Sequence, residues 1–387
     1  MSAPRCYLDY NATTPLRPGA RAAMVAVLEA TGNPSSIHAE GRAARRVVEQ
    51  ARAQVAALVG AAADAIVFTA GATEGAALAL SPTLAGPTAP RGVRRLLVCA
   101  TEHAAVRHGH RFAEADVTVL PVDRHGVLRL DALASALADD GGSPALLALQ
   151  AANNETGVLQ PTRVAAQLVH AAGGLLVCDA VQMAGRMPFG LEESGADVAL
   201  LSSHKIGGPQ GVGAVALAPG VVLGAALVRG GGQERGARSG TENVAGIAGF
   251  GAATLESRDS ESDRLAALQH RLEHGLAALD AEASVFGGAV ARLPNTTAFA
   301  VPGMAAETLL IALDLAGLAV SSGSACASGK VARSHVLDAM GVPAILAQGA
   351  LRLSTGWAST AADIDRFLTA FDVARRRMRK GPLPIAA

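Results

Sequence analysis

The chain has 387 residues, of which half are apolar and 17% are charged, and its formal net charge at pH 7 is zero. This length suits one large and one smaller domain, and the absence of a basic excess argues against nucleic-acid-binding or membrane-surface proteins. No apolar stretch is long enough to span a bilayer, and residues 1–6 lack a signal-peptide core, so we expect a soluble cytoplasmic protein. Cys6, Cys99, Cys178 and Cys326 lie far apart, which argues against a metal site or a disulfide framework.

The first half of the chain alternates between helical and extended patterns. Residues 42–58 carry apolar side chains at helical spacing, and Gly60 follows where a helix commonly ends. Further helices are predicted at 130–138 and 161–172. The short apolar runs predict strands at 65–69, 95–100, 117–122, 145–151, 175–181, 198–202 and 212–217. This alternation predicts an α/β fold with a mainly parallel sheet covered by helices.

The pattern changes after about Gly251. A charged helix over 255–279 is predicted to lead into a smaller α+β unit. We therefore expect a large domain over 16–256 and a small domain made from 1–15 and 257–387. Within the small unit, strands are predicted at 295–301, 318–321 and 351–354, and helices at 305–315 and 361–377.

Lysine is rare in this chain, because only Lys205, Lys330 and Lys380 stand against thirty arginines. A plain positive charge can be supplied by either residue type, whereas only a lysine amine can condense with an aldehyde. Lys205 follows the apolar run 197–201 directly, so we interpret it as a reactive amine. The alternative is a leftover surface lysine.

Two further groups also follow predicted strands. Residues 70–75 open an apolar helix, and Thr73 with its small neighbours would offer a hydroxyl and free N–H groups to an anion. Asp179 ends a strand at the sheet edge where ligands of α/β sheets bind, and it could hold a protonated pyridine nitrogen. With Lys205 they could serve one aromatic, phosphate-bearing aldehyde. The ordinary alternatives are a Thr N-cap and a helix-capping Asp.

Three more features could complete a cofactor bed. His103 follows a predicted strand and could stack on a ring or move protons, although a lone histidine is often only solvated. Residues 153–157, Asn-Asn-Glu-Thr-Gly, offer amide donors for a phenolic oxygen. Arg352 stands in an otherwise apolar strand and needs an anionic partner, either a substrate carboxylate or a structural Asp or Glu.

Cys326 lies within residues 321–329, Ser-Ser-Gly-Ser-Ala-Cys-Ala-Ser-Gly. A segment of such small residues is expected to form a mobile, exposed loop at about 322–333. By contrast, Cys99 and Cys178 are expected to be buried. A thiol on such a loop indicates a nucleophile that moves between the active site and the surface. The alternative interpretation is an exposed cysteine without a function. Because a free thiol has a pKa of about 8.5, its site must activate it.

Seven short motifs occur in order between Tyr7 and Trp357. They are Tyr7-Leu8-Asp9-Tyr10-Asn11-Ala12-Thr13-Thr14-Pro15, Gly32-Asn33-Pro34-Ser35-Ser36, Gly71-Ala72-Thr73-Glu74, Asn153-Asn154-Glu155-Thr156-Gly157, Ser203-His204-Lys205, Arg238-Ser239-Gly240-Thr241-Glu242-Asn243 and Ser322-Gly323-Ser324-Ala325-Cys326. Together they resemble the cysteine desulfurases, pyridoxal-phosphate enzymes of the class V aminotransferase group. The Ser-Gly-Ser-Ala-Cys loop resembles the nitrogenase-type and housekeeping iron–sulfur subgroup.

The resemblance implies a fold type I transferase that converts L-cysteine to L-alanine and leaves a persulfide on Cys326. A protein acceptor, either an iron–sulfur scaffold or a thiolation protein, would then receive the sulfur. Lys205 would bind pyridoxal 5'-phosphate covalently, His103 would stack on its ring and assist proton transfer, and Asp179 would pair with the ring nitrogen. The other implied contacts are Gln182 and Asn154 to the ring oxygen, Thr73, Ser202 and His204 to the phosphate, Thr241 to the phosphate of the partner subunit in a homodimer, and Asn33 and Arg352 to the substrate carboxylate.

The chain departs from the family pattern after residues 375–377, because housekeeping members carry a longer tail that helps to dock the scaffold. Two other functions stay open. A selenocysteine lyase would need nearly the same pocket, and a non-catalytic sulfur-relay subunit would keep the fold. Cys326 argues against a mechanism without a thiol, and an intact Lys205, His103 and Asp179 argue against loss of activity. A dinucleotide-binding protein is a distant candidate, since no G-x-G-x-x-G follows the first strand.

Overall fold

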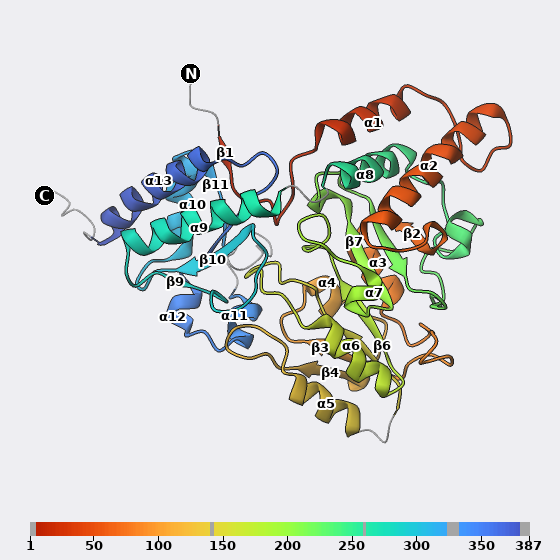
Figure 1. Cartoon of the computed structure of the whole chain (residues 1–387), viewed down its shortest axis with the longest axis horizontal. Coiled ribbons are helices and arrows are strands. Elements are labelled where there is room, and N and C mark those ends of the chain that lie inside the picture. Colours follow the sequence, from red (N-terminus) through yellow and green to blue (C-terminus); the bar gives the residue numbers. More distant parts are fainter. Residues whose placement is uncertain (1–4, 140–142, 258–260, 323–332, 380–387) are drawn as a thin grey trace, which may run out of the picture.

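The computed structural model describes residues 5–139, 143–257, 261–322 and 333–379. Its largest element is a seven-stranded sheet in the order β2-β8-β7-β6-β5-β3-β4 (Figure 1). All neighbouring strands pair in parallel except β8, which is antiparallel to β2 and β7, so the predicted mainly parallel sheet is confirmed. The strands are β2 (Ile66–Thr69), β3 (Arg95–Cys99), β4 (Val117–Leu120), β5 (Ala145–Ala148), β6 (Leu175–Asp179), β7 (Val198–Ser202) and β8 (Gly213–Leu217).

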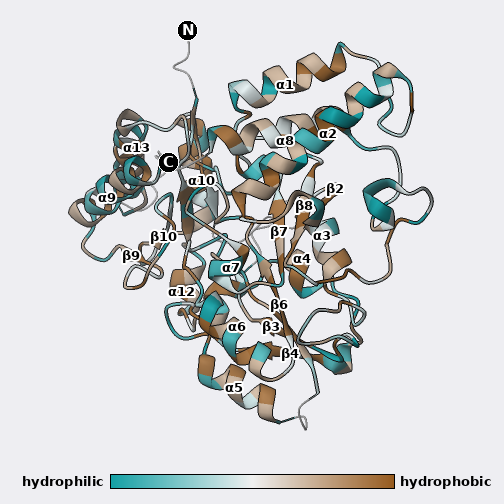
Figure 2. Cartoon of the chain, turned by 45° about the vertical axis from the view of Figure 1, so that its right-hand side comes forward, coloured by the Kyte–Doolittle hydropathy of each residue, from teal (hydrophilic) through white to brown (hydrophobic). Residues whose placement is uncertain are grey.

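Hydrophobic clusters cover both faces of this sheet. In β7, Val198 and Leu200 belong to one cluster and Ala199 and Leu201 to the other, because successive side chains point to opposite faces. Strands buried on both sides are therefore continuous apolar runs, and Figure 2 shows them in brown between the helices. The helices of this part are α1 (Pro18–Leu28), α2 (Ala39–Leu58), α3 (Ala72–Ala79), α4 (Ala104–Arg107), α5 (Leu130–Ala138), α6 (Thr162–Ala171), α7 (Leu191–Ser194) and α8 (Val244–Glu256).

A four-stranded antiparallel sheet, in the order β12-β13-β10-β9, forms a second part beside the large sheet (Figure 1). Its own hydrophobic cluster centres on Phe299, Phe367 and Phe371, whose rings contact one another. The elements are β9 (Ser284–Val285), β10 (Thr296–Ala300), β12 (Ser321–Ser322), β13 (Leu351–Ser354), α9 (Ser262–Leu279), α10 (Ala306–Leu315), α11 (His335–Ala339), α12 (Ala344–Ala347) and α13 (Ala361–Arg379), with the separate parallel pair β1 (Cys6–Tyr7) and β11 (Leu318–Ala319).

Two predicted elements are wrong in part. The helix predicted at 255–279 is divided, because α8 ends at Glu256 and α9 begins at Ser262. Arg17 Nη1 donates a hydrogen bond to the Glu256 carbonyl oxygen at 3.0 Å. In a continuing helix this oxygen would have accepted a backbone hydrogen bond instead. The strand predicted at 318–321 is two short strands, and the chain passes between them from the β1–β11 pair to the four-stranded sheet.

The other predicted strands and helices are present with ends that differ by a few residues. Gly60 has a φ of +64°, the left-handed conformation expected just after α2. The domain boundary at 256/257 stays a prediction, which the separate sheets and clusters support. Within the described residues, no helix is both long and apolar enough to cross a membrane.

Candidate active site

A cavity of about 630 Å³ opens where the carboxyl ends of β2, β3, β5, β6 and β7 meet. These strands run in the same direction, so the residues that follow them gather at one edge of the sheet. Asn11, Ser321 and Arg352 close the cavity from the side of the smaller sheets. Of the residues singled out in the sequence, the cavity wall contains Thr73, His103, Asn154, Asp179, Gln182, Ser202, His204, Lys205 and Arg352.

Lys205 lies in a short 3₁₀ turn that follows β7 directly. Its Nζ donates to the carbonyl oxygens of Asn11 at 2.6 Å and of Ala12 at 2.9 Å. Burial, followed by the charges of Arg186 and Arg352, lowers the pKa of the amine from 10.5 to about 8. About a tenth of the amine is therefore unprotonated at pH 7, far more than for an ordinary lysine, and this is the form that acts as a nucleophile or base.

Asp179 and His103 face the same cavity from the ends of β6 and β3. Asp179 Oδ1 accepts from the Val181 N–H at 2.9 Å, so it caps a turn rather than a helix, and burial raises the pKa of its carboxyl. His103 Nδ1 accepts from the Ala105 N–H at 3.1 Å, which leaves the proton of a neutral ring on Nε2. Burial lowers the pKa of His103, which favours this neutral form.

The N-terminus of α3 forms another part of the wall. Gly71 is the N-cap residue, so the alternative that Thr73 is only an N-cap is wrong. The Thr73 side chain is exposed at the cavity. A Cβ at Gly213 would lie 2.7 Å from the Gly71 Cα. The backbone of β8 therefore packs directly against the backbone of this turn. Nearby, His204 shares a hydrogen bond of 3.1 Å with the Thr13 hydroxyl, and burial lowers the pKa of His204 to about 4. The ring is therefore neutral and can donate a hydrogen bond.

Arg352 reaches the cavity from β13 and is 7% exposed. Its Nη2 pairs with Asp9 Oδ1 at 2.7 Å, and its Nη1 donates to the Asn154 carbonyl at 3.0 Å. Asp9 is thus the structural acidic partner of Arg352, one of the two alternatives that the sequence left open. The Nε of Arg352 is buried without a hydrogen-bond partner, so a donor remains for a second anion.

Asn153 and Asn154 have different environments. Asn153 is buried, donates to the Thr101 carbonyl at 3.0 Å and accepts from the N–H groups of Glu155 and Thr156. Its amide is therefore used in holding the loop. Asn154 lies on the cavity wall instead.

Two of the described residues singled out in the sequence do not line this cavity. Asn33 is exposed between α1 and α2, where its Oδ1 accepts from the Ser35 N–H at 2.9 Å. Thr241 is also exposed and is not among the residues of the cavity wall. Cys326 and most of the loop predicted at 322–333 lie outside the described residues. Cys99 and Cys178 are buried, as predicted.

Sequence reasoning missed several residues that support the site. Asn11 supplies a carbonyl to Lys205 although its own motif gave it no role. Arg186 donates to the Lys205 carbonyl at 3.1 Å, and no local pattern indicated this contact. Glu102 is fully buried beside His103, and burial together with Asp179 raises the pKa of its carboxyl.

Comparisons with known proteins agree with this architecture. Residues 6–367 match the family model described as aminotransferase class-V. A protein of Cereibacter sphaeroides described as a cysteine desulfurase is 44% identical over 372 residues, which cover 94% of each chain. A cysteine desulfurase of Gluconacetobacter diazotrophicus is 42% identical over 94% of this chain and 91% of its own. The solved structure of a NifS-like protein from Rickettsia africae superposes with a TM-score of 0.85 at 33% identity, covering 96% of this chain and 99% of that one.

Proposed function

The chain belongs to the class-V aminotransferase family, and we propose that within this family it is a cysteine desulfurase that converts L-cysteine to L-alanine. The observation that carries the proposal is the desolvated amine of Lys205, placed at one sheet edge with Asp179 and the N-terminus of α3. Relatives with this activity match nearly the whole chain, which supports the same reaction here.

The cavity residues fit pyridoxal 5'-phosphate. They offer an amine for its aldehyde (Lys205), a carboxylate for its ring nitrogen (Asp179) and a helix N-terminus for its phosphate, next to Thr73. Ser202 and His204 line the same wall and would add donors to the phosphate, while Gln182 and Asn154 would contact the ring oxygen. When bound, the cofactor would supply an electron sink for the charge left at the substrate Cα.

The protein side chains would then orient the substrate and move its protons. Arg352, with its unpartnered Nε, would bind the substrate carboxylate, and Asn33 is proposed as its second ligand. Lys205 would take the proton from the substrate Cα, because its lowered pKa of about 8 suits a base near neutral pH. His103 would cover the ring and pass a proton through its neutral imidazole.

Cys326 is proposed as the sulfur acceptor, on the evidence of the sequence. Its thiolate would attack the substrate sulfur, so that an S–S bond forms as the C–S bond breaks and the electron pair stays on carbon. Protonation of that carbon gives alanine, and the cysteine sulfur remains as a Cys326 persulfide. The net reaction is cysteine plus enzyme thiol to alanine plus enzyme persulfide, which balances without another reactant.

We also propose a cytoplasmic homodimer that passes sulfur to a protein acceptor in iron–sulfur cluster assembly or thiolation. Thr241 supports the dimer, because it is exposed and does not line its own chain's cavity, as expected of a residue that serves the partner's site. The resemblance of the Cys326 segment to the iron–sulfur subgroup supports the acceptor class.

The test is anaerobic incubation of the protein with L-cysteine and a thiol reductant, with sulfide and alanine measured together. Equimolar products are expected, and Cys326→Ala should lose sulfide release while it keeps the cofactor absorbance. Cys6→Ala, which removes a buried thiol from β1, is the matched control and should turn over normally. Turnover of selenocysteine alone would replace the proposal with a selenocysteine lyase, and a protein that binds no cofactor would indicate a sulfur-relay subunit.

A further inference from the structure

Arg186 holds the back of the Lys205 turn through carbonyl groups. Its Nη2 donates to the backbone oxygens of Lys205 and Tyr10 at 3.1 Å each. Its Nη1 donates to the Gln182 carbonyl at 3.1 Å and to the Gln182 side-chain oxygen. These four acceptors come from three distant segments, so one guanidinium joins the N-terminal segment, the turn after β6 and the turn after β7.

The charge of Arg186 is not neutralised by an acid. In the part of the chain that the structure describes, no carboxylate pairs with it, and burial lowers its pKa to about 9, which still leaves it charged at neutral pH. Arg186 is partly buried. A cation that is withdrawn from water usually has an anionic partner, because an unpaired charge there is costly. This arrangement therefore needs an explanation beyond packing.

A second arginine, Arg17, binds the carbonyl of the next residue in this turn, Ile206, and differs from Arg186 in having an acidic partner. Its Nε donates to the Ile206 carbonyl at 2.9 Å, much as Arg186 bonds the carbonyl of Lys205. Arg17 is paired with Glu261, however, through two bonds of 3.0 and 3.2 Å. Two arginines thus hold consecutive carbonyls, and only one of them carries an unneutralised charge.

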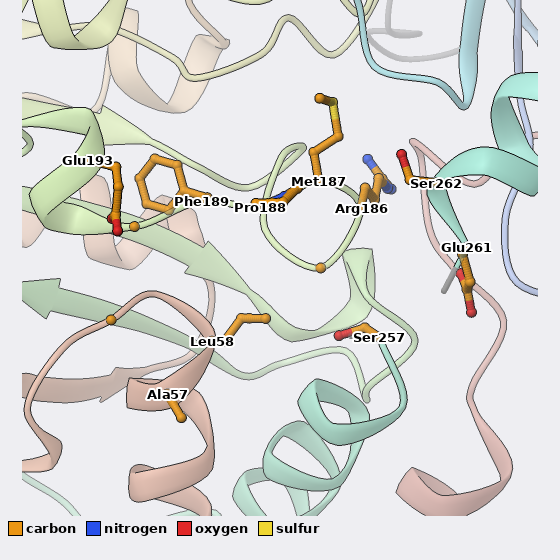
Figure 3. A pocket seen from close by; sticks show the side chains of 13 residues that line it. Ala57, Leu58, Arg186, Met187, Pro188, Phe189, Glu193, Ser257, Glu261 and Ser262 are labelled. Atoms are coloured by element: carbon orange, nitrogen blue, oxygen red, sulfur yellow. The ribbon is translucent and has the colours of Figure 1, made fainter. Parts of the chain in front are cut away.

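Arg186 approaches from a second cavity, of about 600 Å³, behind the turn (Figure 3). This cavity lies between the end of α2, residues 185–190 and the start of α9, and Figure 3 shows Arg186 there between Met187 and Ser262. Arg186 is absent from the wall of the candidate active site among the described residues. Its influence on the chemistry therefore passes through the cavity residues that it contacts, Gln182 and Lys205.

Four charged groups act on the Lys205 amine. Arg186 lowers its pKa more than Arg352 does, and Asp179 and Asp9 raise it by smaller amounts. The charge of Arg352 is already compensated by its 2.7 Å ion pair with Asp9. The neighbouring imidazoles add no positive charge at neutral pH, because burial lowers the pKa values of both His103 and His204. Arg186 is the cation whose removal should change the amine most.

We propose that Arg186 is a positioning residue that fixes the Lys205 turn from behind and, through its unpaired charge, raises the fraction of the Lys205 amine in the unprotonated form that reacts with an aldehyde. The inference rests on the proposed function, in which Lys205 carries pyridoxal 5'-phosphate. It adds a residue that touches neither cofactor nor substrate and yet sets the reactivity of the one that does.

The rarity of lysine allows a direct test. The cofactor-free full-length chain, labelled with lysine carrying ¹³C at Cε, has three labelled side chains, and Lys205→Arg assigns the Lys205 resonance. We expect Lys205 to titrate near pH 8, and Arg186→Met to move the midpoint toward the ordinary value of 10.5. A shift of one unit would make the unprotonated fraction at pH 7 about tenfold smaller.

Arg17→Met is the matched control, because it removes a neighbouring carbonyl clamp without removing an unpaired charge. In Arg17→Met the Lys205 titration midpoint should stay near pH 8. In Arg186→Lys, which keeps the charge, the Lys205 midpoint should also stay near pH 8. An unchanged midpoint in Arg186→Met would overturn the proposal. So would an equal shift in Arg17→Met, since the effect would then come from loss of the clamp. If Arg186→Met does not fold, Arg186→Gln removes the charge and keeps a donor, and it should show the same shift.

The second readout is the rate at which added pyridoxal 5'-phosphate becomes covalently attached, followed by absorbance between pH 7 and pH 10. Arg186→Met should attach about tenfold more slowly than the unsubstituted protein at pH 7, and the two rates should converge at high pH. If the unsubstituted protein attaches no cofactor, the proposed function fails, while the lysine titration still decides the role of Arg186.

Discussion

Arg52 and Glu234 form a two-bond ion pair in the interior, with N–O distances of 2.7 and 2.8 Å and both side chains 2% exposed. Glu234 also accepts from the Phe68 N–H at 2.8 Å, and the Arg52 guanidinium lies 4.8 Å from the Phe68 ring centre. The pair fastens α2 and β2 to a turn in which Glu234 and Arg235 have φ values of +45° and +55°. Residues other than glycine rarely adopt this conformation, so the ion pair stabilises a strained turn.

Glu234→Gln should lower the free energy of unfolding by about 3 kcal/mol, because it breaks a buried ion pair and leaves Arg52 with only the exposed Glu49 carboxylate as an anionic partner. The double variant Arg52→Met with Glu234→Leu should lose less than the sum of the two single variants. Urea denaturation measures both. Asp365→Asn, which breaks the exposed pair with Arg271, is the control and should cost less than about 1 kcal/mol. Additive losses at Arg52 and Glu234 would contradict the coupling.

Arg352→Lys should raise KM for L-cysteine on the order of tenfold or more, since lysine cannot reproduce the geometry of the guanidinium. The cofactor absorbance should be retained. Arg292→Lys is the matched control, because Arg292 is similarly buried and paired with Glu273, outside the cavity wall. A KM equal to that of the unsubstituted enzyme in Arg352→Lys would remove Arg352 from the substrate site.

Gly213→Ala should weaken binding of pyridoxal 5'-phosphate by about 1–3 kcal/mol. The new Cβ would lie 2.7 Å from the Gly71 Cα and push the turn at the start of α3 away from β8. Equilibrium titration of the cofactor-free protein gives the dissociation constant. Gly232→Ala is the control, since no atom lies within 4 Å of its added Cβ. Equal affinities in the two variants would mean that the turn does not contact the cofactor.

His170 should make stability depend on pH. Its Nε2 lies 2.8 Å from Asp197 Oδ2, and this hydrogen bond raises the pKa of the ring above 6.5. Protonation is therefore favoured in the folded state, so the contribution is complete below the unfolded pKa of 6.5 and is lost as pH rises through the folded pKa.

His170→Gln should accordingly lose more stability at pH 5.5 than at pH 8.5, by about 1 kcal/mol or less because the pair is partly exposed. Unfolding by urea at the two pH values checks this. His274→Gln, at an exposed position on α9, should show no such difference. A larger loss at pH 8.5 would reverse the sign and rule out the proposed linkage.

The sequence was most informative where one local pattern specifies one structure. The strands of the large sheet are continuous apolar runs, and Asp179 and Lys205 follow such runs, so both elements and site residues could be predicted. The two-residue strands β1, β9 and β11 have no recognisable pattern, because pairing with distant partners creates them. The break between α8 and α9 likewise depends on Arg17, more than 200 residues away in the sequence.

The same reason explains the missed site residues. Arg186 and Asn11 matter through backbone contacts with Lys205 that no spacing in the sequence indicates. Arg352 could be singled out as a buried cation, but its partner Asp9, 343 positions away, could not be identified. Asn33 and Thr241 came from motif resemblance alone, and the structure leaves both outside this chain's cavity.

Asn11 also bears on the order in which the protein is made. Its backbone N–H donates to the Ser354 hydroxyl at 2.9 Å, and its carbonyl accepts from Lys205. This N-terminal segment is therefore fixed by β13, the last strand of the described residues. Large proteins commonly fold from the N-terminus as they emerge from the ribosome. Here the complete pocket cannot form until β13 has left the ribosome, so a nascent chain cannot bind the proposed cofactor in the finished geometry before that point.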